Sequence, residues 1–192
     1  MDKNSEVITI VSGLPRSGTS MMMKMLEAGG MLVLTDHIRA ADADNPKGYY
    51  EFERVKQIAC DQSWLPEARG KAVKIISELL KHLPPDYDYK VIFMRRQIEE
   101  TLASQRQMLI RRGETTNKAG DKRLAELFRR HLVWLDSRLQ KQANTGLVYV
   151  DYAEVIANPA GQAKRINQFL HHRLDAEAMA GVVDPLLYRQ RR

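Results

Sequence analysis

The chain has 192 residues, 44% of them hydrophobic, and a formal net charge of +6. This length fits one folded unit with a sizeable core, so residues 1–192 are interpreted as a single domain. The one cysteine, Cys60, excludes an intrachain disulfide framework and a multi-cysteine metal site, which favours a cytoplasmic location. The first residues do not resemble a signal peptide and no apolar run reaches membrane-spanning length, so we expect no membrane partner.

The first part of the chain predicts a strand, a helix and a second strand. Residues 7–12 are a run of mainly β-branched residues, as in a buried strand. A helix is predicted at 19–28, where hydroxyl residues open it and two glycines close it. A short strand is predicted at 31–34.

The middle of the chain begins with an irregular segment. Residues 35–50 show no periodicity and contain Asp, Asn, Pro and Gly, so we expect a loop there, with a turn at 45–48. A helix is expected to begin near Glu51, because the apolar residues that follow share one helical face. A buried strand is predicted at 72–76 and a short helix at 77–82, which ends before two prolines.

The remaining elements alternate in the same way. A strand at 90–94 and a helix at 97–111 are predicted from their apolar patterns. A polar, glycine-containing loop is expected at 112–120, and a long amphipathic helix at 121–142.

A last strand is predicted at 147–150. An Asn-Pro pair caps the last clear helix, expected from residue 158 to about residue 171. No structure is assigned to 184–192. Strands that alternate with helices indicate a three-layer α/β fold with a central parallel sheet. Ligands of such sheets bind beyond the carboxyl ends of the strands, where the loops after residues 12, 76 and 94 are expected to meet.

The loop between the first strand and the first helix has the form of a phosphate cradle. Gly13 and Gly18 have the spacing of the glycines in a Walker A loop. Loop N–H groups and the positive end of the following helix would converge on an anion there. Thr19 stands where the Walker lysine should be, and Arg16 is the only cation of the loop.

A second motif follows the strand at 90–94. That strand runs into Arg95 and Arg96, where a Walker B strand would end in an aspartate that binds Mg²⁺. Arginine suits direct, bidentate binding of phosphate. Ser104 lies about two turns along the next helix, on the side of the helix start, so it and an arginine could hold one phosphate group.

Basic residues gather around this second motif. Residues 95–130 contain ten Lys or Arg and five Asp or Glu, so most of the net charge lies in this stretch. It is either a solvated helical face or part of a pocket for a polyanionic small molecule. Nucleic acid is not expected to be a partner, because no aromatic residues alternate with the charges.

Together the two motifs resemble those of the sulfotransferase family, which uses 3′-phosphoadenosine-5′-phosphosulfate (PAPS) as its donor. The resemblance extends from about residue 7 to residue 171. It includes the late strand and acidic turn at 148–152, and a segment at 45–51 similar to a loop of many bacterial members. It implies the P-loop NTPase-like sulfotransferase fold, as in a small bacterial-type member. It also implies transfer of a sulfuryl group from PAPS to a hydroxyl or amine.

In the family, the Pro-Arg-Ser-Gly-Thr-Ser loop binds the 5′-phosphosulfate, and an Arg–Ser pair eight residues apart binds the 3′-phosphate. The resemblance implies that the nucleotide is bound by Gly13, Pro15, Arg16, Ser17, Gly18, Thr19, Ser20, Arg96 and Ser104. Arg16 would stabilise charge on the leaving 5′-phosphate oxygen, and Lys74, at a strand end, would contact the transferred group. No metal is expected, because a sulfuryl group carries less charge than a phosphoryl group.

The general base is the open point of this interpretation. Many family members place a histidine where this chain has Ile76, so that histidine is absent. Glu51 is our choice, because some relatives use an acid after the first helix. Asp36, His37 and His82 are the alternatives.

Two other functions fit parts of the sequence. A P-loop kinase or nucleotidase would use Mg-ATP, with Asp151 as the metal ligand. A non-catalytic relative would bind a polyanion, since the family's late Arg-Gly nucleotide segment has no clear counterpart beyond Arg189, Arg191 and Arg192. The acceptor, a small molecule, glycan or peptide, would lie in a pocket built by 35–51 and 112–120.

Overall fold

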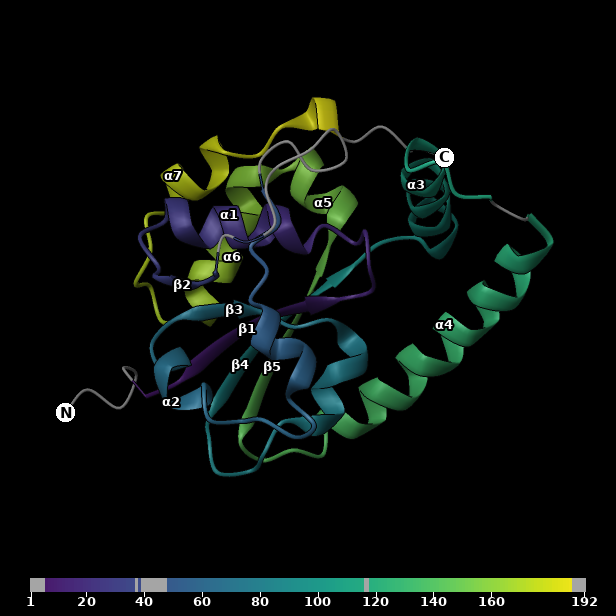
Figure 1. Cartoon of the computed structure of the whole chain (residues 1–192). Helices are drawn as coiled ribbons and strands as arrows, with labels where there is room; N and C mark the ends of the chain where they lie inside the picture. Colours follow the sequence, from purple (N-terminus) through teal and green to yellow (C-terminus); the bar gives the residue numbers. More distant parts are fainter. Residues whose placement is uncertain (1–5, 37, 39–47, 116–117, 188–192) are drawn as a thin grey trace.

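A five-stranded parallel sheet forms the centre of the molecule (Figure 1). The computed structural model describes residues 6–36, 38, 48–115 and 118–187. Within them the strands are β1 (Ile8–Gly13), β2 (Val33–Leu34), β3 (Ala72–Lys74), β4 (Tyr89–Arg95) and β5 (Thr145–Asp151). Their order is β2-β3-β1-β4-β5, and every neighbouring pair is parallel. The predicted α/β architecture with a central parallel sheet is confirmed.

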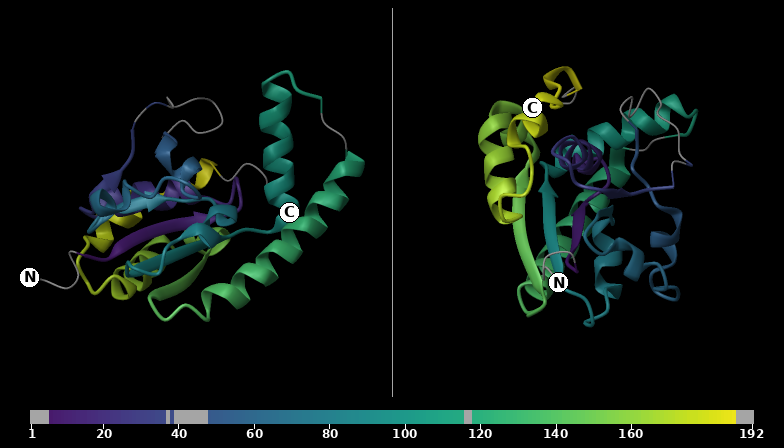
Figure 2. Two further views of the ribbon diagram at one scale, coloured as in Figure 1. Left: turned by 60° about the horizontal axis from the view of Figure 1, so that its bottom comes forward. Right: turned by 90° about the vertical axis from the view of Figure 1, so that its left-hand side faces the viewer.

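Helices cover both faces of this sheet (Figures 1 and 2). One face carries α1 (Thr19–Ala28), α5 (Tyr152–Ala157), α6 (Pro159–Phe169) and α7 (Ala176–Gly181). The other carries η2 (Glu53–Gln57), α2 (Leu65–Ala68), η3 (Ser77–His82) and α4 (Lys118–Leu139). The helix α3 (Ile98–Arg111) follows β4 and packs against α4 beyond the strand's carboxyl end.

Alternation along the central strands builds both halves of the core. In β4, Val91 and Phe93 pack on the side of α4, whereas Ile92 and Met94 pack on the side of α1. Burying each such side chain contributes about 1.5–3 kcal/mol. Because β1 and β4 are buried on both faces, the loops that follow them start from the most firmly held part of the sheet.

Two short polar residues fix the helices after β5. The Asp151 carboxylate accepts a hydrogen bond from the N–H of Ala153 and begins α5. The Asn158 side chain accepts from the N–H of Gly161 at 2.9 Å, and Pro159 follows it as the first residue of α6. The Asn-Pro cap predicted from the sequence is therefore present, and the helix that it begins ends at Phe169.

Several predicted elements have different bounds. The expected helix from Glu51 is only the 3₁₀ helix η2, because the Glu51 carbonyl accepts from Thr35 and Asp36 and not from a residue one turn later. The strand expected at 72–76 ends at Lys74, where its pairing with β1 ends, and η3 begins at Ser77. The helix expected at 121–142 is α4, three residues earlier at each end, which shortens the loop expected at 112–120.

Three short helices were not predicted. The helices α2, α5 and α7 have four to six residues, too few for an apolar period to be visible. Near the unassigned end of the chain, Pro185–Leu187 form a 3₁₀ turn, η4. The rest of that end lies outside the described residues, as do residues 45–47 of the turn expected at 45–48. No helix in the described part of the chain is both long and apolar enough to span a bilayer.

Candidate functional site

The loop between β1 and α1 depends on its two glycines. Gly13 has φ +152°, and a Cβ there would lie 2.4 Å from Ser17 Oγ and 2.7 Å from the Met94 carbonyl oxygen. Gly18 has φ +99°, and a Cβ there would lie 2.4 Å from the ring of Tyr152. The backbone therefore passes too close to β4 and to the start of α5 for any larger residue.

Arg16 connects this loop to α3. Its φ of +67° places a non-glycine residue in the left-handed region, which is uncommon and typical of functional loops. Its Nε donates to Ser104 Oγ at 3.1 Å, and its carbonyl accepts from Arg96 Nη1 at 3.2 Å. The structure thus brings together the loop and the Arg–Ser pair that the sequence suggested.

Arg96 is held on several sides. Its Nε donates to Glu100 Oε2 at 3.0 Å, and the Arg96 and Glu100 side chains are only 8% and 2% exposed. The ring of Tyr152 lies 4.6 Å from the Arg96 Cζ, in cation–π geometry. Sequence reasoning gave no role to Glu100 or Tyr152. The spacing contained a signal, because Glu100 lies four residues after Arg96 and four residues before Ser104, one helical turn from each.

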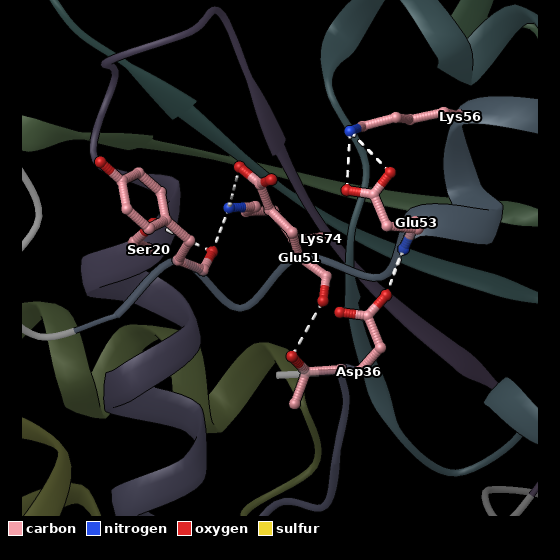
Figure 3. A network of polar contacts seen from close by, with 8 residues as sticks. Ser20, Asp36, Glu51, Glu53, Lys56 and Lys74 are labelled. Atoms are coloured by element: carbon pink, nitrogen blue, oxygen red, sulfur yellow. Dashed lines mark hydrogen bonds and ion pairs between the residues drawn. The ribbon is translucent and has the colours of Figure 1, made fainter. Parts of the chain in front are cut away.

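On the β3 side of the loop, polar groups form a connected network (Figure 3). The Lys74 amine, on a side chain 9% exposed, donates to the Tyr49 carbonyl and lies 3.6 Å from Glu51 Oε1. Ser20 Oγ donates to the same Tyr49 carbonyl at 3.3 Å. The predicted catalytic pair Lys74 and Glu51 is therefore adjacent, and it is joined to the start of α1 through Tyr49.

The alternative bases are placed differently. The Asp36 carboxylate accepts from the N–H groups of Glu53 and Ile38, at 2.6 and 3.0 Å, so it organises the turn before η2. His82 ends η3, and its carbonyl accepts from Gln62. His37 lies outside the described residues. Of the four candidates, Glu51 is the one that the structure shows paired with Lys74.

A pocket of about 480 Å³ lies on the other side of the loop, between α4 and the carboxyl ends of β4 and β5. Leu14 and Ser17 of the loop reach its wall. The Arg95 guanidinium stacks 3.4 Å above the ring of Tyr149, whose hydroxyl donates to Asp136. Burial and the neighbouring carboxylate raise the pKa of Tyr149 to about 12, so the phenol stays protonated at neutral pH.

Local ion pairs offset much of the charge of the basic stretch. Glu99 pairs with Arg129 at 2.7 Å, and Asp136 lies 3.8 Å from Arg95. Further pairs join Arg106 to Asp121 and Arg130 to Glu126. These contacts favour a solvated helical surface for most of the stretch. Arg96, by contrast, is buried and contacts the β1–α1 loop.

Two observations bear on metal binding. Asp151, the metal ligand of the kinase alternative, is the N-cap of α5. Within the part of the chain that the structure describes, no three His, Cys, Asp or Glu side chains gather in a group that could hold a metal ion.

Comparison with known proteins identifies the family. Residues 8–191 match the sulfotransferase domain family, so the chain belongs to the sulfotransferases. This assignment agrees with the resemblance inferred from the loop and the Arg–Ser pair, and it favours an enzyme of sulfuryl transfer over a P-loop kinase. None of the curated proteins matches the chain.

Solved structures of sulfotransferases share the fold. The sulfotransferase domain of the olefin synthase from Synechococcus PCC 7002 superimposes with a TM-score of 0.58 at 16% identity, over 96% of this chain and 80% of that one. The mouse sulfotransferase SULT7A1, in a complex with PAP, gives a TM-score of 0.53 at 18% identity, over 95% of this chain. This chain spans 64% of the mouse protein.

Proposed function

We propose that this sulfotransferase takes its sulfuryl group from PAPS and transfers it in line to a hydroxyl or amine acceptor, without a bridging metal ion. One observation carries the proposal. Arg16 of the β1–α1 loop contacts Ser104 through its side chain and Arg96 through its carbonyl, so two anion-binding motifs form one continuous site. A nucleotide with phosphates at both its 5′ and 3′ positions fits two adjoining anion sites.

The loop suits the 5′-phosphosulfate. Its N–H groups and the N-terminus of α1 provide partial positive charge, and the hydroxyls of Thr19 and Ser20 lie in the first turn of that helix. Gly13 and Gly18 keep the backbone close to β4 and Tyr152, which gives the cradle its shape. Ser17 and Pro15 complete the turn, with Ser17 N–H donating to the Leu14 carbonyl.

Arg96 and Ser104 suit the 3′-phosphate. A buried guanidinium forms strong, charge-assisted hydrogen bonds to phosphate. Arg16 links the two residues, because its side chain donates to Ser104 and its carbonyl accepts from Arg96. The mouse structure in complex with PAP supports this choice of nucleotide, since it has the same fold.

The catalytic roles follow from position. Arg16 would stabilise negative charge on the leaving oxygen, as pre-placed cations do in acyl and phosphoryl transfer. Lys74 would contact the transferred group, and Glu51 would accept the acceptor's proton. Their 3.6 Å separation supports a shared location on the β3 side of the loop.

Calorimetric titration with adenosine 3′,5′-bisphosphate tests the 3′-phosphate assignment. Arg96→Ala should weaken binding by about 1–3 kcal/mol, the usual loss of a charged hydrogen-bond partner. Arg95→Ala is the matched control, because the neighbouring arginine stacks on Tyr149 instead. Thermal unfolding checks that both variants fold. If folded Arg96→Ala binds the nucleotide as tightly as the wild type, the assignment is wrong.

A further inference from the structure

The ion pair between Arg96 and Glu100 is the most deeply buried charged contact near the site. Glu100 Oε2 lies 3.0 Å from Arg96 Nε, and the Glu100 side chain is 2% exposed. An ion pair at this depth loses much of its hydration, so it is weak evidence for a purely stabilising role. Its position in the site calls for a different explanation.

Glu100 controls how the Arg96 guanidinium is presented. Arg96 Nε donates to Glu100 and Arg96 Nη1 donates to the Arg16 carbonyl, while the Tyr152 ring lies against Arg96 Cζ. Three contacts from three elements fix a planar group that otherwise rotates about several bonds. An arginine fixed in this way binds an anion at one place and in one orientation.

Glu100 and Ser104 lie one turn apart on α3, and each contacts a different arginine of the site. Glu100 contacts Arg96, whereas Ser104 contacts Arg16. The negative charge of Glu100 also offsets part of the positive charge of this pair, which reduces attraction for anions that lack the right geometry.

We propose that Glu100 is a positioning residue that makes the site selective for a nucleotide with a 3′-phosphate. It holds Arg96 in the orientation that a 3′-phosphate requires. Its negative charge lowers the affinity for anions that are attracted to the site by charge alone. This inference rests on the proposed PAPS-dependent function.

The experiment compares adenosine 3′,5′-bisphosphate with AMP, which differ only in the 3′-phosphate. Calorimetry gives both dissociation constants for the wild type, Glu100→Gln, Glu100→Asp and the control Glu99→Gln. The control removes the neighbouring acid, which pairs with Arg129 outside the 3′-phosphate pair. Circular dichroism and thermal unfolding report folding of each variant.

We expect the preference for the bisphosphate over AMP to fall about ten-fold or more in Glu100→Gln, the effect of one charged hydrogen bond. AMP binding should be unchanged or tighter, since a negative charge is lost. Glu100→Asp should keep part of the preference, and Glu99→Gln all of it. A structural role alone would weaken both ligands equally, which would overturn the proposal.

Two further outcomes are distinguishable. If Glu100→Gln does not fold, Glu100→Asp tests the proposal instead. Its shorter side chain cannot keep the 3.0 Å contact with Arg96 without a shift. A folded Glu100→Asp with the wild-type preference overturns the positioning role. If the wild type itself does not prefer the bisphosphate, the proposed donor is wrong, and the role of Glu100 falls with it.

Discussion

Arg16 is the only cation of the β1–α1 loop, because Thr19 stands at the position of the Walker lysine. A lysine is a flexible point charge, whereas a guanidinium has several fixed donors. Here Nε donates to Ser104 Oγ at 3.1 Å, and the backbone carbonyl of the same residue accepts from Arg96. We therefore expect Arg16 to lie at the junction of the two proposed anion sites.

Substitution of Arg16 should mainly affect turnover. Arg16→Ala should lower the rate of adenosine 3′,5′-bisphosphate formation from PAPS about 10²–10³-fold, as removal of one charge-stabilising donor does elsewhere. Arg16→Lys keeps the charge but loses the fork, so its loss should be smaller. The exposed Lys56→Ala serves as the control. Wild-type turnover in Arg16→Ala would remove Arg16 from the mechanism.

Gly18 should be required for stability as well as for the site. Its Cβ would collide with Tyr152 in addition to the cost of a left-handed φ, about 1–2 kcal/mol. Gly30 has a similar φ of +94° but open space around it. Gly18→Ala should therefore lower the free energy of unfolding more than Gly30→Ala does. Equal losses in urea unfolding would mean that the contact with Tyr152 does not constrain the loop.

At the level of the elements, a histidine of α4 lies in the contact between α4 and η3. His131 of α4 lies with Nε2 2.9 Å from Ser77 Oγ and Nδ1 3.4 Å from Glu78. Burial is the largest influence and lowers the pKa of His131 below its ordinary 6.5. Glu78 opposes this shift and Lys81 adds to it. The folded protein therefore favours the neutral imidazole.

This lowered pKa predicts the direction of a pH effect. Below pH 6.5 the unfolded chain binds a proton at this histidine more readily than the folded chain does, so stability falls as the pH decreases through that range. His131→Gln should lose less stability between pH 7.5 and pH 5.5 than the wild type. Urea unfolding at both values measures it, with the exposed His172→Asn as the control. If His131→Gln loses as much stability as the wild type between these two pH values, His131 is not the source of the pH effect.

A regular pattern of several buried residues made an element predictable from the sequence. The strands β1 and β4 and the helices α1 and α3 have several buried residues in a regular pattern, so their existence and type followed from the sequence. The α-helix predicted from Glu51 was wrong, because the Glu51 carbonyl accepts tertiary hydrogen bonds from Thr35 and Asp36 instead of a helical one. Local periodicity carries no information about such contacts.

Within the candidate site, the loop and the Arg–Ser pair could be recognised from residue type and spacing. Their junction could not, since Arg16 and Ser104 are 88 positions apart and meet only in the folded chain. The contact of Tyr152 with Gly18 and Arg96 joins three separate segments in the same way.

For the whole molecule, the parallel sheet explains how the two proposed anion sites come to lie next to each other. The strands β1 and β4 are neighbours in the sheet, with Gly13 paired in register to Met94. Their carboxyl ends therefore lie side by side, and the loop after β1 and the arginines after β4 share one edge (Figure 1). No long-range movement is needed to bring the two phosphate-binding motifs together.

The central claim is that this edge of the sheet binds an adenosine with phosphates at its 3′ and 5′ positions and needs no divalent cation to do so. Calorimetric titration of the wild-type chain in EDTA with adenosine 3′,5′-bisphosphate tests it most directly, alongside ATP with and without Mg²⁺. We predict binding of the bisphosphate without metal and tighter than that of ATP. Magnesium-dependent ATP binding, with no affinity for the bisphosphate, would contradict the account.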